Sequence, residues 1–235
     1  MDRLSTFEGH TLTEIRRDLH RHAEAGWKEF RTSALLAESL SSLGYEVHLG
    51  ADTVAPDARM GVPPADEVAA ARERAREEGA PEAYLEQMGD VTGVIATKTN
   101  GDGPTIGLRT DIDALARQEA MDDDHRPAAE GFASVHPGEM HACGHDAHAA
   151  IGLGIARAFA DTPFDGTLKL FFQAAEEGGR GGKPMAESGH LDDLDHLLAV
   201  HVGLDEPTGT VVSSYDAPLS NAKLDVTFGG APAHA

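Results

Sequence analysis

Side chains that can bind a metal are concentrated in one stretch of the sequence, Gly138–His148. It contains the single cysteine of the 235-residue chain, Cys143, and three of the thirteen histidines, His141, His145 and His148. A thiolate beside imidazoles is a donor set that suits zinc and related divalent metals. A lone cysteine is ordinarily a small buried hydrophobic residue, but the neighbouring histidines favour a metal site here.

Two further groups of donors follow apolar segments later in the chain. Glu176 and Glu177 follow residues 167–173 after two alanines, and His201 follows residues 196–200. One of two adjacent glutamates can bind a metal while the other acts as a general base, which predicts a metal-centred hydrolase site. Taken alone, the glutamates could equally stabilise a helix N-terminus, and His201 could be a hydrogen-bonded histidine at a strand end.

A second chemical interpretation uses the cysteine as a nucleophile. Cys143 paired with His145 or His148 would form a metal-free cysteine hydrolase. This alternative leaves the two glutamates and His201 without a role, and a chelator would distinguish it from a metal enzyme. Within the stretch, His141 and His148 are predicted to support the site rather than to bind metal.

The elements that must position these donors alternate between strands and helices. Strands are predicted at 45–49, 91–97, 105–110, 167–172, 196–200 and 222–228, and helices at 11–43 (one or two), 66–78, 81–88, 146–159 and 183–188. This alternation is typical of an α/β fold with a largely parallel sheet, in which ligands bind beyond the carboxyl ends of strands. Asp111 and Asp113 follow one such strand. They are interpreted either as residues of a ligand site or as residues that form the turn. Residues 116–137 are predicted to be a solvated loop.

Composition and charge narrow the possible partners. Forty acidic and nineteen basic residues give a net charge of −21 at pH 7, which disfavours nucleic acid and anionic membranes as partners of the general surface. The sequence has no apolar run long enough to span a membrane and no signal-peptide pattern, and one cysteine permits no internal disulfide. We therefore expect a cytoplasmic protein. Its acidity fits either a well-solvated surface or a high-salt habitat.

Several motifs together resemble the M20 metallopeptidase/amidohydrolase family, in its aminoacylase-like branch. The most specific are Met-His-Ala-Cys-Gly-His-Asp at 140–146 and Phe-Gln-Ala-Ala-Glu-Glu-Gly at 172–178. Supporting motifs lie at 16–24, 109–115, 199–201 and 230–234. The resemblance implies a three-layer, zinc-peptidase-like α/β catalytic domain with a mostly parallel central sheet.

The resemblance also implies how the chain is divided. Residues 1–217 would be the catalytic domain, with a helical insertion at about 55–90, a feature of the p-aminobenzoyl-glutamate branch. Residues 218–235 would begin a smaller α+β lid or dimerisation domain and break off within it. A further metal-binding histidine of the family is expected downstream of this lid, so the chain is interpreted as a fragment.

Residue roles follow from the same resemblance. Cys143 would bridge two divalent ions, Mn²⁺ or Zn²⁺, with His145, Glu177 and His201 as further ligands, Glu176 as general base and Asp113 as a supporting residue. His234 would reach from one protomer of a dimer into the active site of the other and stabilise the oxyanion.

The implied reaction is cleavage of the amide bond of an N-acyl or N-aroyl amino acid, such as a p-aminobenzoyl-glutamate, by a water that the metals activate. The alternative is an inactive fragment, or a subunit that works only with a partner.

Overall fold

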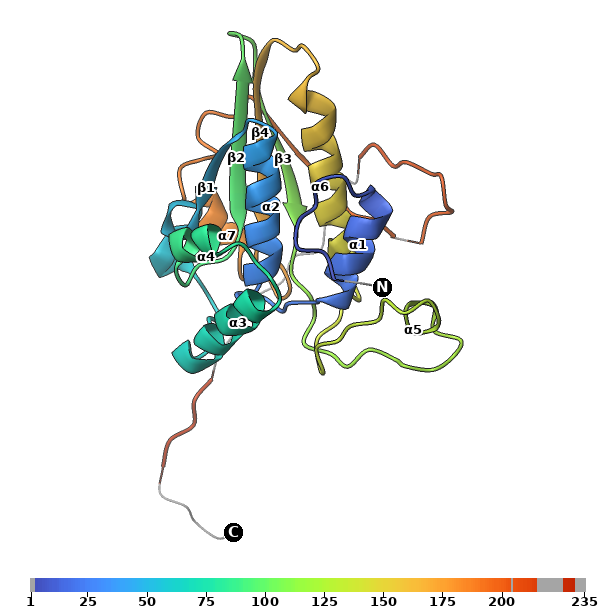
Figure 1. Cartoon of the computed structure of the whole chain (residues 1–235). Coiled ribbons are helices and arrows are strands. Elements are labelled where there is room, and N and C mark those ends of the chain that lie inside the picture. The colour runs from blue at the N-terminus through green and yellow to red at the C-terminus, as the bar shows by residue number, and fades with distance from the viewer. Residues whose placement is uncertain (1–2, 204, 215–225, 231–235) are drawn as a thin grey trace. The chain divides into compact units, whose positions relative to one another are not determined.

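A five-stranded sheet runs through the computed structural model, which describes residues 3–203, 205–214 and 226–230 (Figure 1). The strands are β1 (Glu46–Leu49), β2 (Val94–Asn100), β3 (Thr105–Asp111), β4 (Gly166–Gln173) and β5 (His196–Ala199), in the order β1-β2-β4-β3-β5. Strands β4, β3 and β5 are parallel, while β2 is antiparallel to both of its neighbours. Four strands therefore share one direction, and the predicted α/β class with a mostly parallel sheet is confirmed.

Strand β4 lies in the middle of the sheet because its sequence is apolar on both faces. Leu170, Phe171 and Phe172 are each almost completely buried. Such a continuous apolar run is typical of a strand that is covered on both sides. Phe172 belongs to the main core on one face, and Phe171 packs with Ile95 and Met185 on the other.

Three helices cover the first face: α1 (Leu12–Arg21), α2 (Phe30–Ser42) and α6 (His145–Ala160) (Figure 1). The predicted helical stretch 11–43 is thus a pair. Helix α1 begins with a capping box, in which the Thr11 side chain accepts from the Glu14 backbone N–H and the Glu14 carboxylate accepts from that of Thr11. The second face is covered by α7 (Gly182–Ala186) and the turns that follow it.

The insertion forms a small cluster of its own against the main helices. The short 3₁₀ helix η1 (Gly50–Asp52) precedes it, and the insertion itself contains the 3₁₀ helix η2 (Pro56–Ala58), then α3 (Ala65–Glu77) and α4 (Glu82–Met88). Buried side chains of α3 and α4 pack on Phe30 of α2. As the alanine-rich, charged sequence predicts, most of α3 faces solvent and only its narrow apolar stripe is buried.

The prediction of a solvated loop at 116–137 was wrong in part. The segment contains a short helix, α5 (Arg126–Ala129), and buries Glu119, Phe132 and His136. Burial of Glu119 is possible because its carboxylate pairs with His20 at 2.8 Å. No local pattern in the sequence signals a contact between residues so far apart in the chain.

The chain divides into two compact units, Met1–Leu204 and Asp205–Ala235. The described residues of the second unit, 205–214 and 226–230, contain no helix or strand. Residues 215–225 and 231–235 lie outside the described part of the chain. The strand predicted at 222–228 falls partly there, and His234 falls there entirely. The lid domain that was predicted to begin at 218 stays a prediction.

Candidate metal centre

The predicted donors meet at one edge of the sheet. Glu176 and Glu177 follow β4, and His201 follows β5, while Asp111 is the last residue of β3. Because β3, β4 and β5 are parallel, their carboxyl ends reach the same edge. His145 is the first residue of α6, whose N-terminus reaches this edge as well.

A tight turn brings the cysteine and the first histidine of α6 to the site. Gly144, between Cys143 and His145, has a φ of +82°, a left-handed conformation that glycine adopts without strain. The Sγ atom of Cys143 lies 3.5 Å from Nε2 of His201. Potential ligand atoms of Cys143, His145 and His201 all lie within 4.8 Å of one another.

The two glutamates form a second group around the same imidazole. Ligand atoms of His145, Glu176 and Glu177 also lie within 4.8 Å of one another. Nε2 of His145 is 3.9 Å from a carboxylate oxygen of Glu176. Two donor groups that share one residue match the requirement of a site for two neighbouring ions.

Two potential ligand atoms of these donor groups are buried and have no hydrogen-bond partner among the described residues. They are Nε2 of His145 and Oε1 of Glu177. Leaving such a group unsatisfied costs about 1–3 kcal/mol, so buried polar atoms nearly always have a partner. A divalent cation would satisfy both, and the sulfur, nitrogen and oxygen donors around them fit such an ion.

Asp113 holds both groups in place. Its Oδ1 accepts a hydrogen bond from Nδ1 of His145 at 3.1 Å, and its Oδ2 accepts one from the backbone N–H of Glu177 at 2.9 Å. The bond to Nδ1 leaves Nε2 of His145 as the ligand atom, which is the usual arrangement of carboxylate, histidine and metal.

The electrostatics of the centre favour a bound cation. Burial opposes protonation of His145, but its hydrogen bond to Asp113 and the surrounding carboxylates outweigh this and raise its pKa to about 9. Burial, with Glu177, Glu176 and Asp111 nearby, raises the pKa of Cys143 to about 11. The thiol therefore stays protonated at neutral pH, which argues against a metal-free cysteine nucleophile. A cation would favour the thiolate and the neutral imidazole instead.

The other two histidines of the motif lie beside the two donor groups, and His148 forms a further group of potential ligands with Asp111 and His145. Nδ1 of His148 bonds to the Asp111 carboxylate, and Nε2 of His148 accepts from the backbone N–H of Val202 at 2.8 Å, which fixes the turn that carries His201. His141 is buried outside the two donor groups, and burial lowers its pKa to about 4, so its ring is neutral.

Arg109 is a residue of this edge to which the sequence analysis gave no role. Its guanidinium lies 2.9 Å from Asp111 and 3.9 Å from Glu176, and its Nε donates to Gln173 at 2.9 Å. An arginine inside a mostly buried strand was the available signal, because such a residue is seldom buried without a partner.

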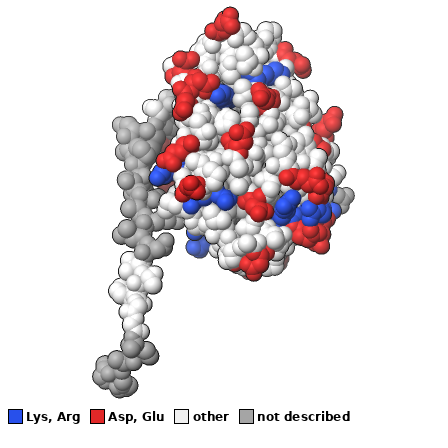
Figure 2. Space-filling model, turned by 90° about the vertical axis from the view of Figure 1, so that its left-hand side faces the viewer, with Lys and Arg blue, Asp and Glu red and all other residues white. Residues whose placement is uncertain are grey.

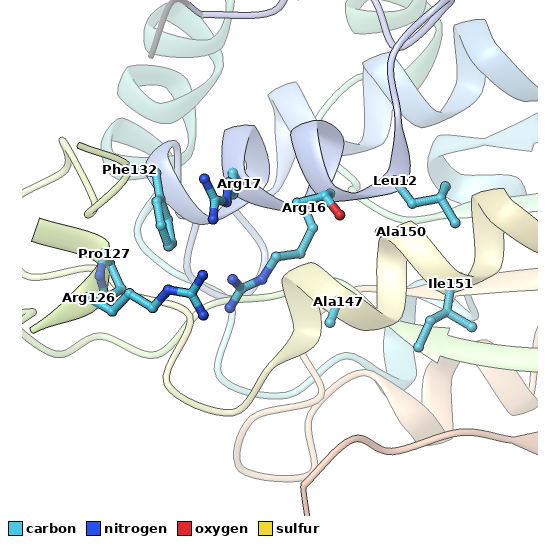
Figure 3. Close-up of a pocket in the computed structure, with 10 residues that line it drawn as sticks. Leu12, Arg16, Arg17, Arg126, Pro127, Phe132, Ala147, Ala150 and Ile151 are labelled. Carbon is cyan, nitrogen blue, oxygen red and sulfur yellow. The ribbon is translucent and has the colours of Figure 1, made fainter. Parts of the chain in front are cut away.

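A cavity of about 580 Å³ lies apart from the donors, between α1, α5 and α6 (Figure 3). Arginines and apolar side chains line it, and none of the predicted metal ligands does. Arg16 is paired with Asp146 at 2.7 Å and Arg17 with Glu130 at 2.6 Å. No cysteine, histidine or acidic residue lines the cavity, so it lacks the metal-binding side chains that meet at the strand ends.

Comparison with known proteins agrees with this geometry. The family model described as peptidase family M20/M25/M40 matches residues 107–235, more than half of the chain. The chain belongs to this peptidase family. The matched residues include all the donors at the strand ends, so the motifs that predicted the family are those on which the candidate centre is built.

Curated relatives of this M20-family chain include two hydrolases of N-acylated amino acids. It is 49% identical over 229 residues to the indole-3-acetyl-aspartic acid hydrolase of Enterobacter agglomerans, covering 95% of this chain and 52% of the relative. It is 46% identical over 230 residues to a subunit of the p-aminobenzoyl-glutamate hydrolase of Escherichia coli, with the same coverage. The chain thus spans about half the length of the curated relatives it matches.

Solved structures show the same fold. The aminobenzoyl-glutamate utilization protein from Klebsiella pneumoniae matches with a TM-score of 0.67 and 41% identity, over 82% of this chain and 43% of that one. A dinuclear metal-binding peptidase of the M20 family from Bacillus subtilis matches with a TM-score of 0.59 and 31% identity, over 83% and 44%. Among the described residues, no helix is long and apolar enough to cross a membrane.

Proposed function

We propose that this chain carries the metal centre of an amidohydrolase that cleaves the amide bond of an N-acyl or N-aroyl amino acid. The observation that carries the proposal is the convergence of two donor groups on His145, one with Cys143 and His201 and one with Glu176 and Glu177. Membership of peptidase family M20/M25/M40 supports an amide bond as the target.

Each residue of the centre has a proposed task. Cys143, His145, Glu177 and His201 would hold two divalent ions, for which Zn²⁺ and Mn²⁺ are the best candidates. When bound, the ions supply an acidified water and polarise the substrate carbonyl.

Glu176 is the residue proposed to move the proton. Its side chain is 38% exposed, so it can face a substrate, and it lies beside both Arg109 and His145. It would take a proton from the attacking water and deliver it to the leaving nitrogen. Asp113 keeps the ring of His145 in the orientation that the site needs.

The substrate proposal rests on the relatives. The two hydrolases described above are named for indole-3-acetyl-aspartate and p-aminobenzoyl-glutamate, so an aromatic acyl group on an acidic amino acid is the first substrate class to test.

One of these relatives is itself named as a hydrolase subunit, which supports a heteromer or a dimer as the working form. His234, outside the described residues, is proposed to contribute to the partner's site on the basis of its motif at 230–234 alone. A single cysteine fits a reducing cytoplasm.

The test is hydrolysis of p-aminobenzoyl-glutamate by the metal-loaded protein, with release of glutamate as the readout. Glu176→Gln should lower kcat by about 10²–10⁴-fold while metal content stays unchanged. Glu187→Gln, at an exposed glutamate outside the centre, is the matched control and should keep full activity. An active Glu176→Gln variant would rule out the assigned base, and hydrolysis that resists a chelator would rule out the metal mechanism.

A further inference from the structure

A second cluster of metal-binding side chains lies away from the strand ends. It consists of His48 in β1, Asp52 in η1 and His190 in the turns after α7. Potential ligand atoms of the three lie within 4.8 Å of one another. Strand β1 is the edge strand opposite β5, so this cluster and the centre around His145 are separate.

The nitrogens that face the Asp52 carboxylate can be identified from the contacts. Nδ1 of His48 lies 2.7 Å from Oδ2 of Asp52, and Nε2 of His190 lies 3.8 Å from Oδ1 and 3.1 Å from the backbone carbonyl oxygen of Asp52. The two imidazole rings are 4.6 Å apart between centroids. One carboxylate and two ring nitrogens therefore converge on a single point from two distant parts of the chain.

The outer nitrogen of His48 has a carboxylate near it, although the two are not hydrogen-bonded. Its Nε2 lies 3.8 Å from the carboxylate of Glu46, two residues earlier in the same strand. A carboxylate that comes within hydrogen-bond distance of an imidazole orients the ring and makes its other nitrogen a stronger ligand, and the exposed Glu46 side chain is near enough to do this after a small shift. Glu46 also adds negative charge beside the cluster.

The backbone that carries the cluster is firmly held. His48 pairs with Ile95 of β2 in the sheet, and η1 is closed by Thr53, whose N–H and hydroxyl both donate to the carbonyl of Gly50. The N–H of Ala55 donates to the carbonyl of Pro184 in α7 at 2.7 Å, which ties the two segments together. The backbone thus keeps the three side chains close together, and an ion would replace the present contacts of the two ring nitrogens with Asp52.

We propose that His48, Asp52 and His190 bind one divalent transition-metal ion, with zinc as the best-suited occupant. Two imidazoles and one carboxylate form a zinc donor set, and water can complete the tetrahedron. The imidazoles are largely buried, with 23% and 17% of their side chains exposed, whereas Asp52 is 63% exposed, so an ion can enter from solvent. Because the ligands join the edge of the sheet to the layer behind it, bound zinc stabilises the folded chain.

The test measures the number of zinc ions bound per chain. The full chain is dialysed to equilibrium against zinc, and its metal content is then measured by mass spectrometry. The double variant His48→Ala/His190→Ala should bind one zinc fewer than the wild type and lose part of the zinc-dependent rise in Tm. His196→Ala removes an exposed histidine outside the cluster and should keep the wild-type zinc content and Tm rise. Circular dichroism confirms that each variant is folded.

A second comparison separates this site from the centre around His145. In a Cys143→Ala background, adding the His48→Ala/His190→Ala pair should again remove one zinc ion per chain. This holds however much zinc the centre around His145 still binds in that background. Equal zinc content with and without the two histidines, in both backgrounds, would overturn the proposal. Loss of the same zinc in His196→Ala would also overturn it.

Discussion

Asp113 accepts a hydrogen bond from Nδ1 of His145 at 3.1 Å and so decides which nitrogen of that ring faces the candidate metal centre. Its other carboxylate oxygen accepts from the backbone N–H of Glu177 at 2.9 Å. One buried side chain therefore orients two proposed ligands that come from different elements.

This relationship predicts the effect of changing Asp113. The Asp113→Asn variant keeps the size of the side chain but loses its negative charge and one acceptor oxygen. We expect metal affinity to fall by about 10–100-fold, as for other carboxylates behind metal-binding histidines. Equilibrium dialysis measures this. Asp57→Asn, at an exposed position, should keep wild-type affinity, and unchanged affinity in Asp113→Asn would contradict the assigned role.

The turn at Gly144 provides a second prediction. A Cβ atom added there would lie 2.6 Å from Cγ2 of Val202, and the residue has a φ of +82°. Gly138 has a φ of +80° with nothing within 4 Å of an added Cβ, which makes it a matched control.

Both alanine variants should therefore lose about 1–2 kcal/mol of unfolding free energy from the left-handed conformation. Only Gly144→Ala should also weaken metal binding. Its new methyl group displaces Val202, and this shifts the neighbouring residue His201, a proposed metal ligand. Equal metal affinities for the two variants would show that the close contact has no influence on the site.

A buried ion pair links the insertion to the segment before the cysteine motif. Nε2 of His136 lies 2.6 Å from the carboxylate of Glu78, and Nδ1 of His136 donates to the carbonyl of Ala23. Burial opposes the charged form of both groups. Their mutual contact outweighs it, so the pKa of His136 is raised and the pKa of Glu78 is lowered.

The pair gives a pH-dependent stability whose sign follows from these directions. The raised pKa of His136 gives stabilisation that is complete below its ordinary pKa of 6.5 and is lost as pH rises through its higher folded value. The lowered pKa of Glu78 gives stabilisation that is complete above 4.5 and is lost in stronger acid.

His136→Gln should therefore cost about 1–3 kcal/mol of unfolding free energy in mild acid and less in alkaline buffer. Urea unfolding across this range checks it, with His10→Gln, at a half-exposed histidine, as the control. A loss of stability that does not change with pH would contradict the ion pair.

The acidic surface predicts a response to salt. Acidic side chains are spread over the face shown in Figure 2, and the net charge is −21. Because salt screens the repulsion between them, Tm should rise from dilute buffer to molar KCl. Thermal unfolding followed by circular dichroism measures this. A Tm that stays constant or falls in KCl would favour an ordinary solvated surface over adaptation to high salt.

The sequence was most informative about the strand ends. Apolar runs that finish in acids or histidine predicted β3, β4 and β5 with their site residues, because a buried strand and a polar loop differ sharply in composition. The sheet order and the reversed direction of β2 have no such local signature. Contacts such as Glu119 with His20 could not be predicted either, since they join residues 99 positions apart. Gly144 is part of the sequence motif, but its proximity to the turn at Val202 could be found only from the folded structure.

The measurement that tests the central claim most directly is X-ray absorption of the zinc-loaded protein in the His48→Ala/His190→Ala background. If Cys143 and His145 help to hold two ions, the spectrum contains a sulfur neighbour at about 2.3 Å and imidazole nitrogens at about 2.0–2.1 Å. It also contains a second metal at about 3.5–4 Å. The sulfur signal should disappear in Cys143→Ala. A zinc environment without sulfur in the parent protein, or one that Cys143→Ala leaves unchanged, would contradict the account.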